Sequence, residues 1–395
     1  MRVLHIIPSV GLVRGGPSLA VLAMVKALQY QGIKAEIATT NDNGTDLLNV
    51  SLQQCIEYEQ VPVWFFCRFS PNIKFIREYA FSSQLTTWLW HNISNYDIVH
   101  IHAIFSYPST VAMAIARLKK VPYIVQPHGL LCKWSLQQKS CKKQIYLKLI
   151  EQANLNGSQA LHFTSQQEQQ EANVLELKAP NFILPLGIFP STPVYNARKR
   201  LRQLFNIPPD EPIILFLSRL HPKKGLDYLI PALSKSNHRF TFILAGSGSP
   251  EYEAQIKSLV FSTNLHNSTL LVGFVQGEFK DLLIQGSDLF VLTSRSESFG
   301  IVVLEALIAG LPLLITPGVA LAPIIKQHQV GYVTELDVSA ISCTLDEFLT
   351  NTQAAKDMGE RGRQLVFEKY TWEQIASQMQ QIYTNILQQK AICAC

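Results

Sequence analysis

Short apolar runs alternate with segments of helical periodicity along the whole chain. In the first half, residues 17–30 repeat apolar side chains at helix spacing, and the polar residues 41–60 predict a loop. The apolar runs predicted as strands are residues 3–7, 33–40, 98–102, 123–125, 160–164 and 183–186. Strands and helices that alternate in this way are typical of a doubly wound parallel sheet.

The same alternation restarts after a break at residues 189–212. This segment contains prolines outside any predicted element and the basic sequence ARKRLR, so it predicts an interdomain linker with a short helix. Beyond it, we predict strands at residues 213–217, 240–244, 270–272, 289–292 and 313–315, and helices at residues 226–233, 252–260, 279–285 and 301–309. Residues 371–389 predict one long closing helix.

The predicted fold class is therefore α/β, with two Rossmann-like doubly wound parallel-sheet domains that face each other across a cleft. We predict a first domain over residues 1–190 and a second over residues 191–370, and we expect residues 371–395 to pack back toward the first domain. A length of 395 residues suits two domains better than one core. Such sheets bind ligands at the carboxyl ends of their strands, so the loops there should carry the chemistry.

Composition narrows the class of protein further. Apolar residues make up 47% of the chain and charged residues 16%, which indicates a globular protein. A net charge of +5 without a nucleic-acid-binding motif argues against DNA or RNA as a partner. No apolar run approaches the ~20 residues that span a bilayer, and the N-terminus favours a strand and loop over a signal peptide.

The cysteines and histidines give no sign of a metal site. The seven cysteines are odd in number and form no C-x-x-C pair, which indicates reduced thiols in a cytoplasmic protein. His100 and His102 have no cysteine or carboxylate at ligand spacing nearby, so we predict no metal site there.

The loops that follow the second-domain strands carry charge and glycine. After residues 213–217 come Arg219 and Lys224, which suit a diphosphate as a planar fork and a point charge. The alternative is a solvated basic loop. Gly246 follows the next strand, where it favours a tight turn.

Residues 294–316, SRSESFGIVVLEALIAGLPLLIT, combine a polar turn with a helix start. The Phe299–Gly300 step precedes the helix, and a helix N-terminus attracts anions. Glu297 and Glu305 are unusual beside a phosphate, so we expect them to face uncharged hydroxyl groups. A sugar nucleotide offers hydroxyls at both ends of its diphosphate, which makes it the working hypothesis.

Two features stand at strand ends of the first domain. Gly15 and Gly16 permit close backbone approach after the first strand, although an ordinary tight turn is the better explanation of these two glycines by themselves. His128 lies between proline and glycine after residues 123–125, where it is either a functional or a structural histidine.

These motifs, taken in order, resemble those of family 4 glycosyltransferases, which are retaining enzymes of the GT-B fold. The resemblance rests on GGPS, DIVHIHA, YIVQPHG and ALHFTSQQE in the first domain. In the second it rests on SRL-x-x-x-KG, LAGSG, LVGFV and the E-x₇-E stretch. One departure is that Pro185-Leu186-Gly187 replaces the Asn-Gly usual in the family, which puts contacts of that asparagine in doubt.

The resemblance implies a first domain that binds the acceptor and a second that binds the donor. It implies that Glu297 contacts the hydroxyls of the donor sugar, Glu305 contacts the ribose, and Arg219 and Lys224 bind the diphosphate. The remaining residues that it implies at or near the donor are Gly15, Gly16, His128, Gly246, Phe299, Gly300 and Ile301. The co-substrate would be a UDP- or GDP-sugar, with no cofactor and no metal.

The chemistry of transfer suits these residues. Two cationic side chains and helix N–H groups stabilise the charge that develops on the leaving diphosphate. We expect the diphosphate to take the proton of the acceptor hydroxyl on the same face of the sugar, which gives retention of configuration.

The sequence indicates less about the acceptor than about the donor. Residues 98–150 contain eight basic and no acidic residues, with aromatic and apolar residues interleaved, so segment 117–148 predicts contact with an anionic membrane surface. A solvated basic face is the alternative. Membrane contact would suit a lipid-linked saccharide acceptor in extracellular or capsular polysaccharide synthesis, on the cytoplasmic side of the membrane.

Two other classes of function remain open. One is a different enzyme on the same fold, such as a sucrose- or glycogen-type synthase or a nucleotide-sugar epimerase, although the Glu297/Glu305 pair disfavours the epimerase. The other is a non-catalytic sugar-nucleotide-binding module. A glycosidase fits poorly, because its two carboxylates must flank one scissile bond.

Overall fold

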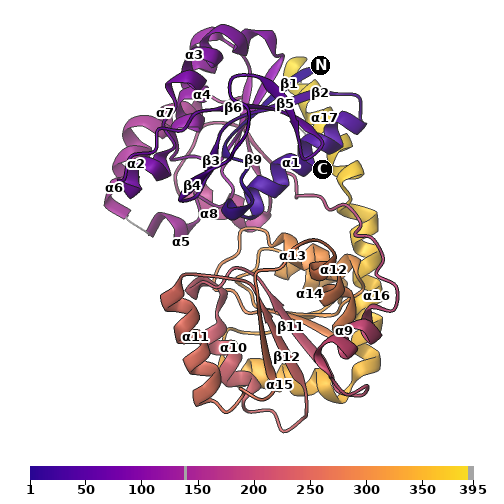
Figure 1. The fold of residues 1–395 in the computed structure, drawn as a ribbon. Helices are drawn as coiled ribbons and strands as arrows, with labels where there is room; N and C mark the ends of the chain where they lie inside the picture. Colours follow the sequence, from indigo (N-terminus) through magenta and orange to yellow (C-terminus); the bar gives the residue numbers. More distant parts are fainter. Residues whose placement is uncertain (138–139, 390–395) are drawn as a thin grey trace. The chain divides into compact units, whose positions relative to one another are not determined.

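The protein, described by a computed structural model for residues 1–137 and 140–389, folds into two compact units. The first contains Met1–Gly187 and the chain from Trp372 onward, and the second is Ile188–Thr371. Each is a parallel sheet with helices packed on it (Figure 1), so the predicted class of two Rossmann-like α/β domains is confirmed.

The first unit is built on an eight-stranded sheet in the order β10-β9-β8-β7-β1-β2-β6-β5. The strands of the sheet are β1 (Arg2–Ser9), β2 (Lys34–Thr40), β5 (Cys55–Tyr58), β6 (Val61–Phe66), β7 (Ile98–His102), β8 (Tyr123–Gln126), β9 (Ala160–Phe163) and β10 (Asn181–Ile183). Its helices are α1 (Gly16–Tyr30), α2 (Lys74–Tyr79), α3 (Ser83–Asn92), α4 (Tyr107–Lys119), α5 (Lys133–Gln137), α6 (Ser140–Tyr146), α7 (Gln152–Asn156), α8 (Gln166–Asn173) and α17 (Trp372–Leu387). Within this eight-stranded sheet, all strand pairs are parallel except β5 with β6.

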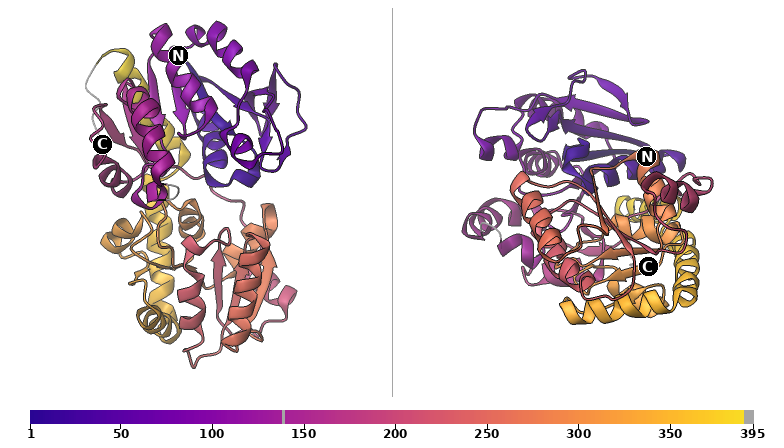
Figure 2. Two further views of the ribbon diagram at one scale, coloured as in Figure 1. Left: turned by 90° about the vertical axis from the view of Figure 1, so that its left-hand side faces the viewer. Right: turned by 60° about the horizontal axis from the view of Figure 1, so that its bottom comes forward.

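The two faces of the first sheet bury different chemistry. Successive residues of a strand point to opposite faces. Leu4 and Ile6 of β1 belong to an apolar cluster that includes residues of α3, α4 and α7. His5, which lies between them, is fully buried on the opposite face, where α17 packs against α1 (Figures 1 and 2). The closing helix is therefore part of the first unit.

The second unit is built on a six-stranded parallel sheet in the order β13-β12-β11-β14-β15-β16. Its strands are β11 (Ile213–Leu217), β12 (Thr241–Ala245), β13 (Thr269–Gly273), β14 (Leu289–Leu292), β15 (Leu313–Ile315) and β16 (Tyr332–Val333). Its helices are α9 (Ala197–Phe205), α10 (Leu226–Leu233), α11 (Pro250–Ser262), α12 (Gly277–Gly286), α13 (Ile301–Ile308), α14 (Ala322–His328), α15 (Val338–Thr350) and α16 (Thr352–Lys369). β11 and β14 are buried at every position, as their apolar sequences predict.

The prediction of a loop over residues 41–60 is wrong. The short strands β3 (Asp42–Asn43) and β4 (Asp46–Leu47) form a hairpin, and β5 pairs with β6 at the edge of the sheet. The buried Asp42 organises this segment, because it accepts hydrogen bonds from Arg14 at 2.6 and 2.9 Å and from the fully buried Arg68. Two arginines that are distant in sequence thus compensate a buried carboxylate, which local polarity did not reveal.

Residues 189–212, predicted as an interdomain linker with a short helix, contain that helix as α9, but they do not form a linker. The segment belongs to the second unit, in which α9 packs against α12. Arg198 and Arg202 of the ARKRLR sequence both donate to Asp288, and Arg202 is largely buried. The basic cluster therefore attaches a helix to the sheet.

Candidate active site

The loops that follow β11 and β14 are joined at one edge of the second sheet. The two strands are neighbours and parallel, so their carboxyl ends lie together. The backbone N–H of Arg295 donates to the carbonyl of Lys223 at 2.8 Å, and the Thr293 hydroxyl donates to the carbonyl of Gly225 at 3.1 Å. The predicted donor-binding residues of these loops therefore share one edge of the sheet.

Lys224 and Glu297 form an ion pair between the two loops. Nζ of Lys224 donates to Oε2 of Glu297, and the side chains are only 10% and 18% exposed. The backbone of Glu297 is fixed by hydrogen bonds to Gly318 at 2.7 Å and from Ala320 at 3.0 Å. In this structure Glu297 faces a lysine, and its expected contact with the uncharged hydroxyl groups of a ligand stays a prediction. A carboxylate this deeply buried is stabilised by a cationic partner.

Arg219 lies in the same loop as Lys224 and is exposed. Within the described ranges, no ion pair or hydrogen bond joins its guanidinium to another residue. Burial makes the largest contribution to lowering the pKa of the nearby His221, and the positive charge of Arg219 lowers it further. The guanidinium is thus available to an anionic ligand.

Two glycines in the turns after β12 and β14 have positive φ angles. Gly246 has a φ of 138°, and a Cβ atom there would lie 1.8 Å from the carbonyl oxygen of Ser218. Gly246 therefore has a structural reason to be glycine, and its contact with a donor stays a prediction. Gly300 has a φ of 87° and begins α13 without a side-chain cap. Phe299 before it is buried, and Ile301 is the first residue of the helix.

Glu305 lies on α13 and has its own lysine partner. Nζ of Lys280, on α12, donates to the Glu305 carboxylate at 2.9 Å, and both side chains are about one quarter exposed. The second carboxylate of the pair is thus also paired with a lysine in the protein alone. Its predicted contact with a ribose stays a prediction.

In the first unit, Gly15 and Gly16 lie at the start of α1. Gly15 has a φ of 80° and no side-chain oxygen caps the helix. The Ser18 hydroxyl donates to the carbonyl of Ser9 at 2.9 Å, which ties the helix to the end of β1. This is the geometry of a tight turn with an uncapped helix N-terminus, and both interpretations of the glycines remain compatible with it.

His128 is held in the turn after β8 from two sides. Its Nε2 lies 3.1 Å from Nδ1 of His102, and the neighbouring Gly129 N–H donates to the Glu168 carboxylate at 2.5 Å. His128 itself has a φ of 53°, a conformation that costs a non-glycine residue free energy. Burial lowers the pKa of His128 to about 3, so its imidazole is neutral.

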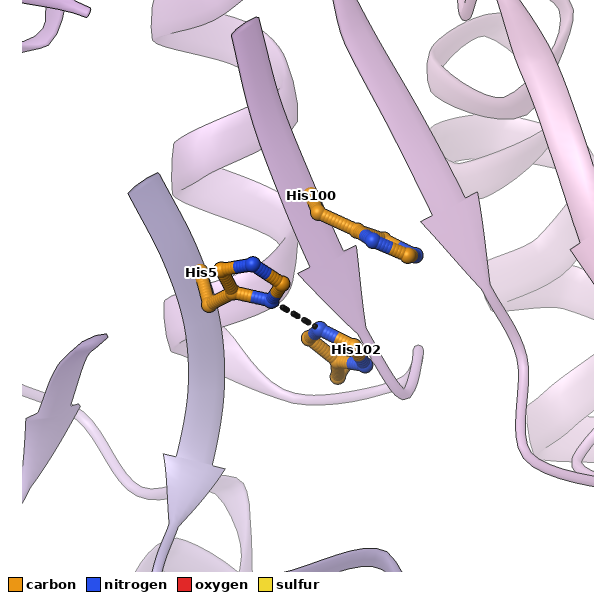
Figure 3. A group of neighbouring side chains, drawn as sticks. All are labelled: His5, His100 and His102. Atoms are coloured by element: carbon orange, nitrogen blue, oxygen red, sulfur yellow. Dashed lines mark hydrogen bonds between the residues drawn. The ribbon is translucent and has the colours of Figure 1, made fainter. Parts of the chain in front are cut away.

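Behind His128, buried histidines share one face of the sheet. His5 of β1 and His100 of β7 are register partners, and His102 follows two residues later (Figure 3). Nδ1 of His5 lies 2.9 Å from Nε2 of His102. His162, on β9, lies 3.4 Å from His100 through its Nδ1. Burial lowers the pKa of all four imidazoles, to about 3 for His5 and about 4 for His162.

His5, His100 and His102 each have one ring nitrogen within 4.8 Å of a ring nitrogen of the other two histidines. Three nitrogens at this spacing could hold a metal ion. However, both nitrogens of His102 already contact imidazole nitrogens of His5 and His128. Those of His100 contact Tyr383 and His162. A metal ion would have to replace these hydrogen bonds, so the hydrogen-bond network accounts for the group by itself.

Sequence reasoning missed His5 and Arg295. His5 joins His100 and His102 only through the register of β1 against β7, which no spacing along the chain reveals. Arg295 donates to both carboxylate oxygens of Asp227, at 2.9 and 2.6 Å, and so holds the start of α10 beside the loop after β14. The signal in the sequence that could have identified Arg295 was its position in the Ser-Arg-Ser turn after the strand at residues 289–292.

A cavity of about 1040 Å³ lies elsewhere in the second unit, and the predicted donor residues do not line it. Its walls include the prolines Pro190 and Pro193 and helix α9. Two of its basic side chains, Arg198 and Arg202, are already paired with Asp288. This cavity is therefore a poor candidate for the diphosphate.

The basic segment 117–148 combines exposed apolar and cationic side chains. Leu118 and Leu149 are 70% and 74% exposed, and the ammonium of Lys119 lies 4.1 Å from the ring centre of Trp90. Lys139, which was predicted as part of this surface, lies outside the described residues. Among the residues that the structure describes, no helix is long and apolar enough to cross a membrane.

Two parallel-sheet domains with a charged strand-end site define the chain as a two-domain Rossmann-like protein of the GT-B class. Solved structures share this fold. Sucrose-phosphate synthase from Thermosynechococcus elongatus superposes with a TM-score of 0.80 and 20% identity, over 99% of this chain and 100% of that one. Anabaena HepE in complex with UDP and glucose gives 0.75 and 18%, over 98% and 100%.

Two family descriptions match the chain. "Glycosyl transferase 4-like domain" covers residues 15–187, and "Glycosyl transferases group 1" covers residues 197–365. The chain belongs to the group 1 glycosyltransferases, as the motif resemblance implied.

Curated relatives match over part of their length. An uncharacterized glycosyltransferase of Methanocaldococcus jannaschii is 31% identical over 185 residues, which is 46% of this chain and 47% of that protein. N-acetyl-alpha-D-glucosaminyl L-malate synthase of Bacillus anthracis is 30% identical over 191 residues, 48% and 49% of the two chains. The O-antigen biosynthesis glycosyltransferase WclY of Escherichia coli is 25% identical over 203 residues, 51% and 55%. The chain thus spans about half the length of the curated relatives that it matches.

Proposed function

We propose that the protein is a retaining glycosyltransferase that moves a sugar from a nucleoside diphosphate sugar to a hydroxyl group of a saccharide or lipid-linked saccharide. The observation that carries the proposal is the contact between Lys224 and Glu297 at the strand-end edge of the second sheet. The exposed Arg219 belongs to the same loop as Lys224, and the uncapped N-terminus of α13 follows Glu297 in the other loop. Family membership supports the same class of reaction.

The charges at this edge suit the two parts of a sugar nucleotide. A bound diphosphate would attract Lys224 away from Glu297, and the released carboxylate could then accept hydrogen bonds from sugar hydroxyls. Arg219 would add a planar fork of donors for the phosphate oxygens. The Lys224–Glu297 pair thus keeps both charges compensated until the donor separates them.

In the reaction, the bond between the anomeric carbon and the phosphate oxygen breaks and its electron pair stays on the diphosphate. The acceptor oxygen forms the new bond on the same face of the sugar, and its proton passes to a phosphate oxygen of the leaving group. Lys224 and Arg219 stabilise the added negative charge, which is the kind of interaction that lowers the barrier most. Gly15, Gly16 and His128 contribute further donor contacts, as the resemblance implies.

The donor is proposed to carry UDP or GDP. HepE, which shares the fold, has been solved with UDP, with UDP and glucose, and with UDP-glucose, which favours UDP as the first compound to test. Thermal shift of the full chain against UDP-, GDP- and ADP-sugars should give the largest rise in Tm for one of the first two. No shift with any of them would contradict the proposed donor class.

The reaction is proposed to be independent of a metal ion, because two cationic side chains supply the positive charge. Transfer should persist in excess EDTA, and the product linkage should be α from an α-linked donor when read by NMR of the anomeric proton. Loss of activity that Mg²⁺ or Mn²⁺ restores would contradict the first claim, and a β-linked product would contradict retention.

The acceptor is proposed to belong to extracellular or capsular polysaccharide synthesis at the cytoplasmic membrane surface. The relative WclY, an O-antigen biosynthesis glycosyltransferase, supports this, and so do the exposed Leu118 and Leu149 and the nearby Lys119. Flotation with vesicles of anionic or of zwitterionic lipid should recover the protein only with the anionic ones. Transfer to a soluble sugar phosphate or glucan, without vesicle binding, would favour a synthase instead.

A further inference from the structure

The buried imidazoles of the first unit form two separate hydrogen-bond chains. One runs from Tyr383 through His100 to His162 and ends at the carbonyl of Leu184. The other runs from His5 through His102 to His128. His100 and His102 lie stacked at 4.4 Å between ring centres, and within the described residues no hydrogen bond joins the two chains of imidazoles.

In the first of these hydrogen-bond chains, the carbonyl of Leu184 at its end determines which atom donates in every bond. A carbonyl can only accept, so Nε2 of His162 carries the proton that is donated to Leu184 over 2.7 Å. Nδ1 of His162 must then accept from Nε2–H of His100, and Nδ1 of His100 accepts from the Tyr383 hydroxyl at 2.8 Å. His100 and His162 are therefore both Nε2–H tautomers. This chain also attaches α17 to the sheet.

The second chain ends differently, at a buried nitrogen without a partner. Nε2 of His5 is buried and has no hydrogen-bond partner in the described part of the chain. If the protons pointed from His128 toward His5, this nitrogen would carry an unsatisfied N–H group. If they point from His5 toward His128, it holds only a lone pair. Orphaned buried N–H groups are the rarer of the two in proteins, which favours the second direction.

We infer that His5 and His102 are positioning residues that hold His128 as the Nδ1–H tautomer, so that it offers a fixed hydrogen-bond donor to an oxygen of the bound saccharide. Nδ1–H of His5 donates to His102, and Nδ1–H of His102 donates to Nε2 of His128. His128 then has a single N–H group, on the nitrogen outside the chain. The part of the inference that concerns the saccharide rests on the proposed function.

This assignment also defines what His128 does not do. Its Nε2 is occupied by the proton of His102, and its Nδ1 already carries a proton, so it has no lone pair with which to take the proton of an acceptor hydroxyl. His128 is therefore a neutral donor and not a general base. The proposed transfer, in which the leaving diphosphate takes that proton, agrees with this arrangement.

The decisive measurement is the tautomer of each histidine in the full chain. Long-range ¹H–¹⁵N correlation spectra of ¹⁵N-histidine-labelled protein at pH 7 distinguish Nδ1–H from Nε2–H, and single His→Phe variants assign the signals. We expect Nδ1–H for His5, His102 and His128, and Nε2–H for His100 and His162. Nε2–H at His128, or a spectrum that changes to metal-bound histidine when Zn²⁺ is added, would overturn the inference.

Two variants with matched surroundings test the effect on transfer. His102→Phe removes the donor to His128, and we expect kcat/KM to fall about 10- to 100-fold, in the range found when partners that orient a functional histidine are removed. His100→Phe deletes an equally buried imidazole from the same strand and face, and it should leave the tautomer of His128 and kcat/KM unchanged. His102→Gln, whose amide N–H can replace the donor, should restore most of the activity.

The outcomes separate this inference from the proposed function. The tautomer spectrum involves no substrate, so the predicted pattern in a protein without transferase activity would contradict only the proposed function and the saccharide contact. A transferase in which His102→Phe and His100→Phe lose the same activity would contradict the positioning role. If His102→Phe does not fold, the wild-type spectrum still decides the direction of the hydrogen bonds, and His102→Gln still tests the effect on transfer.

Discussion

The two sheets of this protein keep their polar groups in different places. β11 and β14 of the second unit bury only apolar side chains, and the charged residues Arg219, Lys224 and Glu297 begin where the strands end. In the first unit, His5 and His100 lie inside the strands and are fully buried. A sheet with an apolar core can lose its ligand site without losing its fold, whereas a sheet with a polar layer depends on that layer being satisfied. Four experiments test this difference.

The largest expected effect is a loss of stability of the first unit in mild acid. Burial holds the pKa of His5 and His128 at about 3 and that of His162 at about 4, and it lowers the pKa of His100 and His102 as well. These imidazoles stay neutral in the folded state but bind protons in the unfolded chain below pH 6.5. Their contribution is therefore complete above pH 6.5 and is lost as the pH falls below it, by about 1.4 kcal/mol per pH unit for each imidazole.

Two buried carboxyl groups act in the opposite direction. Burial raises the pKa of Glu151 and Glu168, so the folded state binds their protons more readily than the unfolded chain does. They are outnumbered by the five imidazoles. Hydrogen exchange of the full chain at pH 7 and pH 5.5, corrected for intrinsic rates, should show loss of protection in β1 and β7 and little change in β11 and β14. Equal losses in both sheets would remove the distinction.

The second effect concerns function. Lys224→Ala should lower kcat by about 10²- to 10³-fold, as when one preorganised group that stabilises developing charge is removed. The fold should persist with a lower Tm, because the variant leaves Glu297 without its lysine but does not change the apolar sheet. Steady-state kinetics with a melting curve test this, and Lys223→Ala, a change to the adjacent lysine, is the control. Unchanged turnover in Lys224→Ala would refute its proposed role.

A third experiment asks how tightly the strand-end loops of the second unit are built. Gly246→Ala would place a Cβ 1.8 Å from the Ser218 carbonyl at a φ of 138°, so we expect a loss of about 2–3 kcal/mol in the free energy of unfolding. Gly273→Ala, at a φ of 71° with nothing within 4 Å of the added Cβ, should cost about 1 kcal/mol. Urea denaturation measures both. If both variants lose a similar free energy of unfolding, the Ser218 carbonyl moves away from the added Cβ without a cost in stability.

The smallest effect is expected at the second carboxylate. Glu305→Gln removes the charge partner of Lys280, a pair that is about one quarter exposed and so contributes about 1 kcal/mol or less to stability. If Glu305 also binds the ribose, the KM for the nucleotide sugar should rise about tenfold, the equivalent of one hydrogen bond to a charged group. Lys280→Gln breaks the same ion pair and serves as the control. If KM rises equally in Glu305→Gln and Lys280→Gln, the rise comes from loss of the ion pair and not from a contact between Glu305 and the ribose.

The second unit was the more predictable of the two because its signals are local. Apolar runs predicted β11 and β14, and the turn residues after them include Lys224 and Glu297, which the structure brings together. What was missed there depends on contacts with distant residues. The attachment of ARKRLR to Asp288 and the lysine partners of Glu297 and Glu305 each join positions that are far apart in the sequence.

The first unit shows where prediction from pattern ends. The strand predicted over residues 98–102 contains His100 and His102, but only the pairing of β1 with β7 brings His5 to them, and only α17 brings Tyr383. Residues 41–60 looked like a loop because the two arginines that hold Asp42 are not in the segment.

Hydrophobic periodicity and turn chemistry thus specify the strands, the helices and the edge at which ligands bind, because these follow from side chains a few residues apart. Which charges pair, and which way each imidazole proton points, are decided by partners that meet only when the sheet is assembled. A buried polar group is stabilised by whatever lies beside it in space, and that neighbour is a property of register and packing.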